Sequence, residues 1–570
     1  MVKIQKQKLL FGANLIDING VDKVKKRKVV FKKYSQTQEF LLPKNLEEEI
    51  CDGHVCRLIS KIIDEIDLAV LFEKYKGGGA SAYNPRMLLK IWILGFINNI
   101  YSSRNLAKQT RENITFMWIS GKQTPDFRTL NNFRNDLGKN IKVIFKEVVL
   151  QGISLGIISG KDIFVDHTKK EANANKHKIV WRKQVERQMK NIDEELDKLF
   201  KYIDEVNEKE DSLFGDKDLP EKERQVFDHD KIKEIANRIN EKIKNKKMSK
   251  NEGKEIKKNI RRTAELIDRK NKYLAKKKML NGRNSYSKID TDAVAMMMKD
   301  KLSIKPAYNE GIAVENGFVV NYIISNNCGD VVSFIPLMNG VIENLDKTPE
   351  TTTADGAYGN EETHSYMEQK NIGNYLKYNS FYRESKKNQK NKKFVLSDFV
   401  FNSHKDEFTC KQGNKLTFSH QKEEYTKSDY EKKIKVYSLS EKFCMQCPLK
   451  EKCTEGKARS LNVSWEAERL KVIARQNLNS EKGKELRSRR ANEVESIFGD
   501  KKLNKKAHRY LLRGIQKVNI EAGLYYIAHN IRKIKKKLKR NYCNEMKKQD
   551  CIQNQLPNLI EYLYRAILTF

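Results

Sequence analysis

Acidic residues at the ends of apolar segments are the first feature that could do chemistry. Asp166 ends the run DIFVD, and Asp355 ends the run TTTAD. Each run predicts a short β-strand, because β-branched and aromatic residues favour strands. A third segment, RRANEVESIFGDKK (489–502), is strongly basic, yet it carries Glu493 and Glu495 only two positions apart. Residues two apart do not share a helix face, so only one of these glutamates can serve a given site.

The neighbours of the two glutamates indicate which one is free to bind a ligand. On a helix over 485–499, Glu493 has Arg489 at i−4 and Arg490 at i−3, a spacing typical of surface ion pairs. Glu495 has alanine and glycine four positions away on either side, so no cation competes for its carboxylate. We therefore predict that Glu495 is the functional residue and Glu493 an ion-pair partner.

Basic residues follow Glu495 at spacings of three or four, which predicts a cationic stripe along one helix face. The stripe consists of Lys502, Lys505, Arg509 and Arg513. It could hold DNA phosphates and position a bond for cleavage. The alternative is a solvated helix face with no ligand.

Four of the nine cysteines fall in one polar segment. The sequence FCMQCPLKEKC contributes Cys444, Cys447 and Cys453. This spacing suits tetrahedral Zn²⁺, which takes four thiolate or imidazole ligands. We expect a structural zinc knuckle with Cys410 as the fourth ligand, for which His404 and His420 are substitutes. The alternative is a group of free thiols.

The composition indicates the kind of partner. The 570 residues include 112 Lys and Arg against 75 Asp and Glu, a formal net charge of +37. Such a surplus favours a nucleic-acid partner. The longest apolar run falls far short of the ~20 residues that a membrane-spanning helix needs, and we find no secretory signal. Few cysteines, in an odd number, fit a reducing compartment, so we expect a cytoplasmic protein.

The elements that must position these residues change along the chain. Residues 46–150 predict a helical region, with Pro85 in the first turn of a helix. From about 160 the order is strand, hairpin pair, helix, strand, helix and strand, which predicts a mixed α/β sheet. The hairpin turn falls at Asn316-Gly317, a strong signal for a two-residue turn.

Two segments interrupt this order. Residues 183–285 are rich in charged residues, with an apolar seam that predicts one helix of an antiparallel helical hairpin. The seam steps alternately by four and three residues through Val185, Met189, Ile192, Leu196, Leu199, Ile203 and Val206. A second helical stretch follows from about 228 to 279. The other interruption, 395–462, is polar and β-rich and contains the cysteine cluster.

Three segments resemble the motif blocks of bacterial insertion-sequence DDE transposases. They read DIFVDHTKKEANANKHKIVWRK, TTTADGAYGNEE and VESIFGDKKLNKKAHRYLLRGIQKVNIEAGLYYIAHNIRK. The segment YNPRMLLKIWILGFINNIYSSRNLAKQTRENITFMWISGKQTPDFRTLNNFR also resembles the helical N-terminal domain of the insertion-sequence 1182 family. The likeness covers most of the chain outside the helical interruption, with all blocks in the expected order.

The resemblance implies an RNase H-like fold in which Asp166, Asp355 and Glu495 bind Mg²⁺ or Mn²⁺. Carboxylates are the ligands that hard divalent ions prefer, and two such ions activate water and stabilise charge on the phosphate. The implied activity is the cutting and rejoining of DNA at the ends of a mobile element.

The blocks also depart from the family pattern. His167 stands where the family usually has glycine, which predicts a larger side chain beside the metal site. Arg490 can serve as the arginine that relatives carry upstream of the glutamate. Relatives also carry a tyrosine upstream of the glutamate, and this sequence has Leu486-Arg487 at that place.

Together these features predict five parts. They are a helical DNA-binding domain (1–150), a catalytic domain (151–182, 286–394 and 463–540), a helical coiled-coil-like insert (183–285), a Cys-rich insert (395–462) and a C-terminal tail (541–570).

The predicted function is DNA transposition. The protein would bind the terminal repeats of an insertion sequence, cleave the ends and join the freed 3′-hydroxyls to target DNA. We expect a homo-oligomer on double-stranded DNA, a dimer in the simplest case, in the bacterial cytoplasm and at the nucleoid when bound. The alternatives are a catalytically inactive descendant acting as a repressor or architectural protein, and a nuclease without strand transfer.

Overall fold

The computed structural model describes residues 45–73, 75, 81–214, 249–381, 393–426 and 428–549, together with positions 237, 240, 241 and 244. Most of the stretch 228–249 and the end of the predicted tail, 550–570, lie outside the described residues. Residues from Ile50 onward belong to one compact unit. Within the described part, no helix combines the length and the apolar character needed to cross a bilayer.

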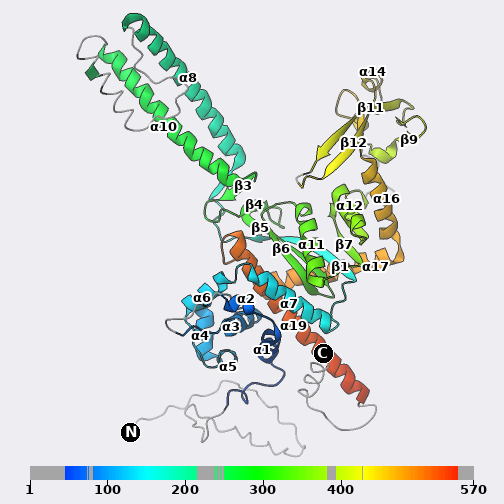
Figure 1. The fold of residues 1–570 in the computed structure, drawn as a ribbon. Helices are drawn as coiled ribbons and strands as arrows, with labels where there is room; N and C mark the ends of the chain where they lie inside the picture. Colours follow the sequence, from blue (N-terminus) through cyan, green and yellow to red (C-terminus); the bar gives the residue numbers. More distant parts are fainter. Residues whose placement is uncertain are drawn as a thin grey trace, which may run out of the picture. The chain divides into compact units, whose positions relative to one another are not determined.

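Helices precede the sheet, as the sequence predicts for 46–150 (Figure 1). They are α1 (Val55–Glu65), α2 (Ala69–Phe72), α3 (Pro85–Ile97), α4 (Ser103–Glu112), α5 (Ile114–Ile119), α6 (Phe127–Asp136) and α7 (Asn140–Ser154). Pro85 is the first residue of α3, and the Asn84 side chain caps that helix by accepting a hydrogen bond from the Arg86 N–H. A proline fits there because the N–H groups of a first turn have no partner within the helix.

The central sheet has the strand order β4-β5-β1-β7-β8, with β6 also paired to β5. The strands are β1 (Asp162–Glu171), β4 (Val294–Met297), β5 (Ile304–Glu315), β6 (Phe318–Ser325), β7 (Thr351–Gly359) and β8 (Gly373–Tyr378). Strand β5 is antiparallel to β1, β4 and β6, whereas β7 is parallel to β1 and β8. Helix α11 (Phe334–Leu345) joins β6 to β7, and α12 (Glu361–Gln369) joins β7 to β8. The predicted order of elements in a mixed α/β sheet is confirmed.

The turn between β5 and β6 is the one predicted from Asn316-Gly317. Asn316 has φ 53° and Gly317 has φ 69°. Both residues therefore occupy the left-handed region that a tight hairpin turn of this kind requires.

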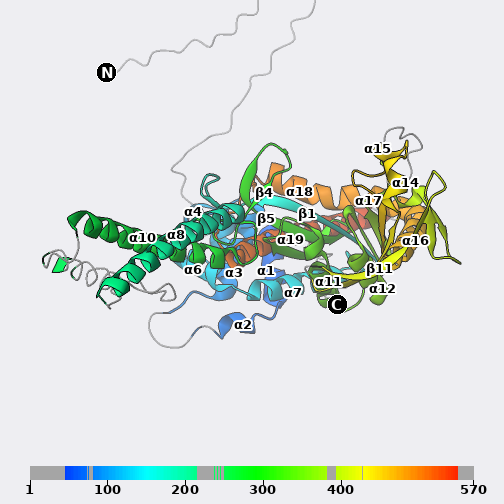
Figure 2. The ribbon, with the colours of Figure 1, turned by 90° about the horizontal axis from the view of Figure 1, so that it is seen from above.

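Two long helices, α8 (Arg182–Phe214) and α10 (Lys250–Leu280), lie side by side (Figures 1 and 2). The apolar seam of α8 packs against α10 as predicted. Its buried members are Val185, Ile192, Leu196 and Ile203, and α10 contributes Ile256, Ile260, Ala264, Leu266 and Leu280. Short strands β2 (Ile179–Trp181) and β3 (Ser285–Ser287) pair with each other at the base of the two helices.

A second, five-stranded antiparallel sheet follows β8, with the order β13-β12-β11-β10-β9. Its strands are β9 (Val400–Asn402), β10 (Glu407–Thr409), β11 (Lys415–Tyr425), β12 (Glu431–Ser438) and β13 (Ser460–Val463). Short helices α14 (Glu441–Met445) and α15 (Lys450–Cys453) connect β12 to β13. These strands lie in the segment that the sequence predicts to be β-rich.

Helical segments complete the described part of the chain. They are α16 (Trp465–Asn479), α17 (Glu481–Arg490), the π-helical turn η3 (Ala491–Glu495), α18 (Ser496–Gly499), the π-helical turn η4 (Asp500–Asn504) and α19 (Ile515–Gln549). Helix α19 packs against α3, α7 and β6. One apolar cluster therefore runs from the N-terminal helices through the sheet to α19.

A buried ion pair ties the sheet to the C-terminal segment. The Lys501 ammonium on η4 contacts the Glu310 carboxylate on β5, and the two residues are 1% and 0% exposed. The Tyr526 hydroxyl on α19 donates to the same carboxylate at 2.8 Å. Burial by itself would raise the pKa of Glu310, but Lys501 and Lys170 outweigh burial and hold this pKa below its usual range. Glu310 is thus an ionised carboxylate at the centre of the fold.

We expect Lys501→Met to lower the free energy of unfolding by about 3–5 kcal/mol, because it leaves the Glu310 charge buried without its partner. Chemical denaturation of the full chain measures this change. The double variant Glu310→Gln with Lys501→Met should lose less than the single variant, because it removes both charges. Equal stability of Lys501→Met and the unchanged protein would contradict the assignment.

We also expect the rest of the protein to fold without the helical pair. Where β2 pairs with β3, Trp181 lies opposite Ser285, and the Arg182 N–H donates to the Asn284 carbonyl at 2.9 Å. The chain therefore enters and leaves the helical pair at neighbouring positions. Two of the clusters between α8 and α10 consist entirely of residues from these helices. Replacing 184–280 by a short Gly/Ser linker should therefore give a soluble protein that unfolds cooperatively in a calorimeter. Insoluble protein would show that the helices are needed for the main core.

Candidate active site

The two aspartates of the predicted triad lie on neighbouring parallel strands. The pairing of β1 with β7 ends where Phe164 lies opposite Thr353. Asp166 and Asp355 each lie two positions beyond that pair, so they share one face of the sheet. The sequence places both at strand ends, which is wrong, because β1 continues to Glu171 and β7 to Gly359. They lie instead where the two strands stop pairing with each other.

The two carboxylates have different surroundings. The Asp166 side chain is 17% exposed, and its Oδ1 lies 3.2 Å from the Arg490 guanidinium. Burial raises the pKa of Asp166, Arg490 opposes that rise, and the nearby charge of Asp355 adds to it. Asp355 is exposed, and its Oδ1 accepts a hydrogen bond from the Gly356 N–H at 2.8 Å. The pair combines a partly buried carboxylate beside an arginine with a solvent-facing one.

Arg490 and Glu495 belong to a segment that is not the uniform helix predicted for 485–499. Helix α17 ends at Arg490, and the π-helical turn η3 follows. A π-helix bonds residue i to residue i+5, so Glu495 lies one turn beyond Arg490, and such turns are frequent at functional sites. The turn packs against β1 and β5. Glu495 is exposed and makes no hydrogen bond or ion pair within the described residues.

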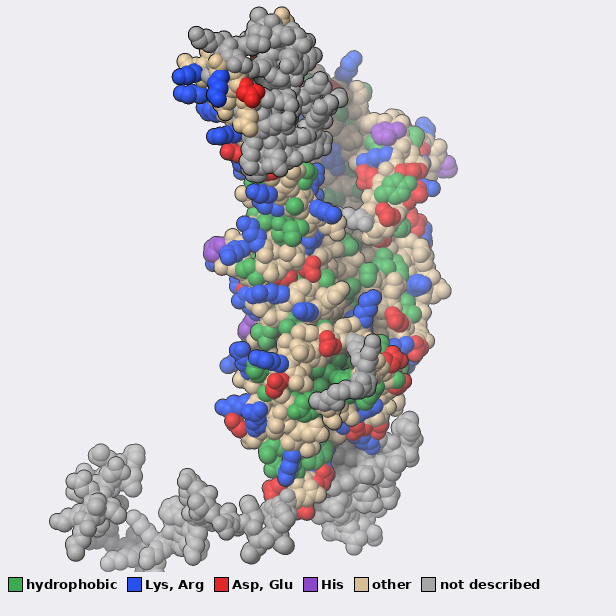
Figure 3. All heavy atoms as spheres, turned by 60° about the vertical axis from the view of Figure 1, so that its left-hand side comes forward, with side chains coloured by type: hydrophobic (Ala, Val, Ile, Leu, Met, Phe, Trp, Pro, Cys, Tyr) green, Lys and Arg blue, Asp and Glu red, His purple; other side chains and the backbone are tan. Residues whose placement is uncertain are grey.

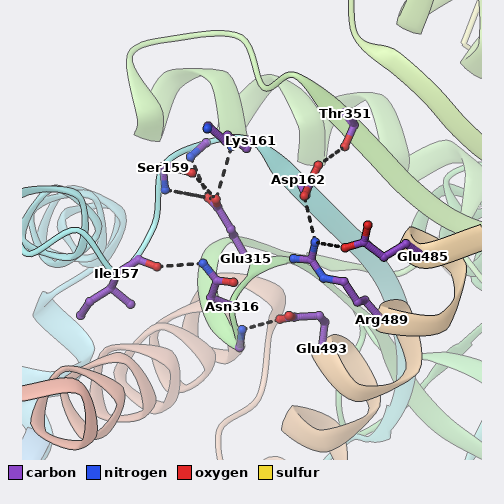
Figure 4. A network of polar contacts seen from close by, with 12 residues as sticks. Ile157, Ser159, Lys161, Asp162, Glu315, Asn316, Thr351, Glu485, Arg489 and Glu493 are labelled. Atoms are coloured by element: carbon purple, nitrogen blue, oxygen red, sulfur yellow. Dashed lines mark hydrogen bonds and ion pairs between the residues drawn. The ribbon is translucent and has the colours of Figure 1, made fainter. Parts of the chain in front are cut away.

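Glu493 has a different partner from the one predicted. Arg489 pairs with Asp162 at 3.0 Å and with Glu485 at 3.5 Å, while Arg490 pairs with Asp166. The Glu493 carboxylate instead accepts a hydrogen bond from the Gly317 N–H (Figure 4). Burial raises the pKa of Glu493. The predicted surface ion pair is therefore wrong in its partner, and Glu493 holds η3 against the β5–β6 turn.

The same turn is fixed to the chain that enters β1 (Figure 4). The Glu315 carboxylate accepts hydrogen bonds from the N–H groups of Ser159, Gly160 and Lys161, and from the Ser159 hydroxyl. The Asn316 amide donates to the Ile157 carbonyl at 3.0 Å. These contacts fix one end of the segment that carries Glu495 relative to the strand that carries Asp166.

The other end of the segment is held by two lysines. Lys501 pairs with Glu310, as described above, and the Lys502 ammonium donates to the Thr168 hydroxyl at 2.6 Å. Thr168 lies two residues after Asp166 on the same strand. Glu495 is thus on a stretch of chain that is attached to β1 and β5 on both sides.

The predicted cationic stripe after Glu495 is wrong in its geometry, because residues 505–514 are not helical. Lys505 donates to the Ile97 carbonyl at 2.7 Å, and Arg509 donates to the Ala172 carbonyl at 3.0 Å. Arg513 donates to the Asn173 carbonyl at 2.9 Å. Lys505 is therefore held at the end of α3, and the two arginines hold the chain that leaves β1, so these cations do not form one exposed face.

His167 is buried rather than beside the carboxylates. It follows Asp166 on the strand, so it points to the opposite face. Its Nδ1 lies 2.7 Å from the Tyr358 hydroxyl. The opposite residue on β5 is Gly311, where a Cβ atom would come within 2.3 Å of the imidazole ring. The missing side chain of Gly311 makes room for His167, and the prediction of a larger side chain beside the site is wrong.

The donor types fit divalent cations, although the residues do not form a closed metal site. Among the described residues, no group of three or more His, Cys, Asp or Glu side chains is arranged to hold a metal ion. Asp166 and Asp355 are brought together, and their mutual repulsion is what a bound cation would relieve. Glu495 does not join them in such a group.

The four cysteines lie near one another around the second sheet. Burial raises the pKa of Cys453, and the neighbouring Cys410, Cys444 and Cys447 raise it further. All four are free thiols, and Cys444 is buried. His404 and His420 are exposed on the second sheet. Four neighbouring sulfur donors fit the chemistry of zinc, but as placed they form no metal-holding group among the described residues.

The sequence prediction missed the residues that position the site. These are Asp162, Glu310, Glu315 and Lys501, which fix the segment around Glu495 to the sheet. A usable signal was present for one of them, because Glu310 is a single acidic residue inside the buried run PAYNEGIAV. A charge in such a run needs a buried partner.

Comparisons with known proteins found a family match in two segments of the chain. Residues 44–136 match the family model described as Transposase domain (DUF772), and residues 409–535 match the one described as Transposase DDE domain. The second match covers the cysteines and Glu495, whereas Asp166 and Asp355 lie outside both. No curated protein and no solved structure matches the chain. The two family matches mark the chain as a transposase of the DDE type.

Proposed function

We propose that the protein binds the terminal repeats of an insertion sequence of the 1182 family, cleaves the DNA ends and transfers the strands to target DNA. The observation that carries this proposal is the proximity of Asp166 and Asp355 on one face of the sheet, with the Glu495 segment attached on both sides. The sheet would be of the RNase H-like type. An inactive DNA-binding descendant is the alternative.

In this proposal Asp166, Asp355 and Glu495 hold Mg²⁺ or Mn²⁺. The bound ions would activate the attacking hydroxyl and stabilise charge on the scissile phosphate. Arg490 favours the ionised form of Asp166, because an adjacent guanidinium lowers the free energy of the carboxylate. Asp355 and Glu495 are exposed, so their carboxylate oxygens are accessible from solvent. Ligands of an ion that also contacts a DNA phosphate need this access.

The basic surplus supports DNA as the partner. The chain carries a formal charge of +37, and many Lys and Arg side chains gather along one edge of the face in Figure 3. We propose that Arg490, Lys502, Lys505, Arg509 and Arg513 contribute to DNA binding near the site. Their bonds to the protein hold them in place, and the exposed guanidinium groups of Arg509 and Arg513 keep further N–H groups for phosphates.

The same proposal includes the division of the chain into the five parts given above. It also includes an oligomer that pairs two DNA ends and a location in the cytoplasm. Pairing of ends requires two copies of the site, since each copy holds one set of ligands. Duplex DNA carrying the inverted repeats that flank the reading frame is the substrate that tests it.

Glu495→Gln should abolish cleavage of labelled terminal-repeat DNA in Mg²⁺ or Mn²⁺ and leave DNA affinity within about twofold, because it removes one negative ligand and little contact area. Glu493→Gln is the matched control. Its amide oxygen can still accept the Gly317 N–H, so activity should persist. An essential Glu493 beside a dispensable Glu495 would falsify the assignment. Cleavage without joining would favour the nuclease.

We further propose that Cys410, Cys444, Cys447 and Cys453 bind one structural Zn²⁺. Elemental analysis of the purified protein should find about one zinc per chain. Cys444→Ser with Cys447→Ser should remove the zinc and make residues 395–462 sensitive to protease, since metal binding stabilises folding. The matched control, Cys51→Ser with Cys328→Ser, changes two exposed cysteines and should keep the metal. Folded protein without zinc would reject this proposal.

A further inference from the structure

The two long helices differ in charge. Helix α10 has twelve basic and four acidic residues, whereas α8 has seven basic and ten acidic residues. The surplus of eight positive charges on α10 is therefore not shared by its partner. It makes up a notable part of the +37 of the whole chain.

Two groups stand out among the cations of α10. Those near α8 are paired with it: Arg262 lies 2.7 Å from Glu195, and Lys270 lies 2.8 Å from Asp193. The second group faces solvent and makes no ion pair within the described residues. It consists of Lys254, Lys258, Arg261, Arg269 and Lys272, here called the α10 stripe.

The α10 stripe occupies one face of the helix. Its members are separated by four, three, eight and three residues, which keeps all five within an arc of about 80° around the helix axis. The opposite face carries Ile256, Ile260 and Leu266, which are buried against α8. Two acidic residues, Glu265 and Asp268, lie at positions that continue the series. The cations are thus presented away from the seam.

The dimensions of the α10 stripe suit a duplex. From Lys254 to Lys272 the helix rises about 27 Å. Each DNA strand has one phosphate per ~3.4 Å of helix axis, so this length corresponds to roughly eight base pairs. A regular row of unpaired cations of that length matches a regular row of phosphates. A rigid helix also holds the row in place without the cost of ordering a loop.

We propose that the α10 stripe binds the phosphate backbone of duplex DNA outside the catalytic sheet. This inference rests on the proposed function, because it takes the DNA substrate as the ligand. The contacts would be independent of base sequence, since phosphates carry no sequence information. They would hold the DNA that flanks the cleaved end.

The test is the salt dependence of binding to a duplex that carries the flanking inverted repeat. The full-length variant has glutamine at all five stripe positions (K254Q, K258Q, R261Q, R269Q and K272Q). Removing one cation from a DNA phosphate should reduce the slope of log affinity against log salt by about 0.9. We expect the slope to fall by about 3–4 for the five substitutions together, with the far-ultraviolet circular dichroism unchanged.

Helix α8 offers a matched control with the same spacing and the same loss of charge. The control variant changes its exposed cations (K183Q, R187Q, K190Q, K198Q and K201Q). Its slope should fall by less than about 0.9, the value for a single phosphate. Equal reductions in both variants would mean a general effect of charge and would overturn the inference, as would an unchanged slope in the α10 variant.

Two further outcomes separate the inference from the proposed function. If the unchanged protein does not bind duplex DNA, the proposed function fails. If it binds and cleaves, while the α10 variant has the same slope, only the inference fails. Duplex RNA serves as a competitor, and RNA binding stronger than DNA binding through the stripe would also overturn the proposal.

Discussion

The position of the candidate site depends on the buried pair between Glu310 and Lys501. An ionised carboxylate in the centre of a sheet is unstable without a partner, and the partner comes from η4, far along the chain. The pair can form only when the C-terminal segment docks on β5. Tyr526 extends the constraint to α19. Glu495 then lies between this anchor and the hydrogen bond from Gly317 to Glu493.

Sequence patterns predicted the helices, strands and turns well where neighbouring residues determine the local backbone conformation. Pro85 begins a helix, Asn316-Gly317 forms the turn, and the seam of α8 packs as its spacing indicates. The order of strands and helices along the chain also followed from the alternation of apolar segments and turn residues. The two aspartates lie on the predicted strands, although within them.

The prediction failed where the contacts of a residue come from a segment far away in the sequence. Glu493 meets a backbone N–H from residue 317, and His167 fits because a glycine lies opposite it on β5. No spacing within either segment contains that information. The π-helical turns also escape a search that assumes 3.6 residues per turn, and the spacing of Arg509 and Arg513 describes a helix only if the backbone is helical. The backbone there follows the carbonyl groups of the chain after β1 instead.

The π-helical turns have a consequence for which changes in length the chain tolerates. A π turn accommodates one more residue than the same turn of an α-helix, so losing a residue between Arg490 and Glu495 would leave an ordinary α-helical turn without rotating the chain that follows it. Lys501 would then keep its position opposite Glu310. The turn η3 therefore absorbs a change of one residue, whereas α8 and α10 can gain or lose whole heptads together while their seam stays in register. Length variation among relatives should concentrate in the helical pair.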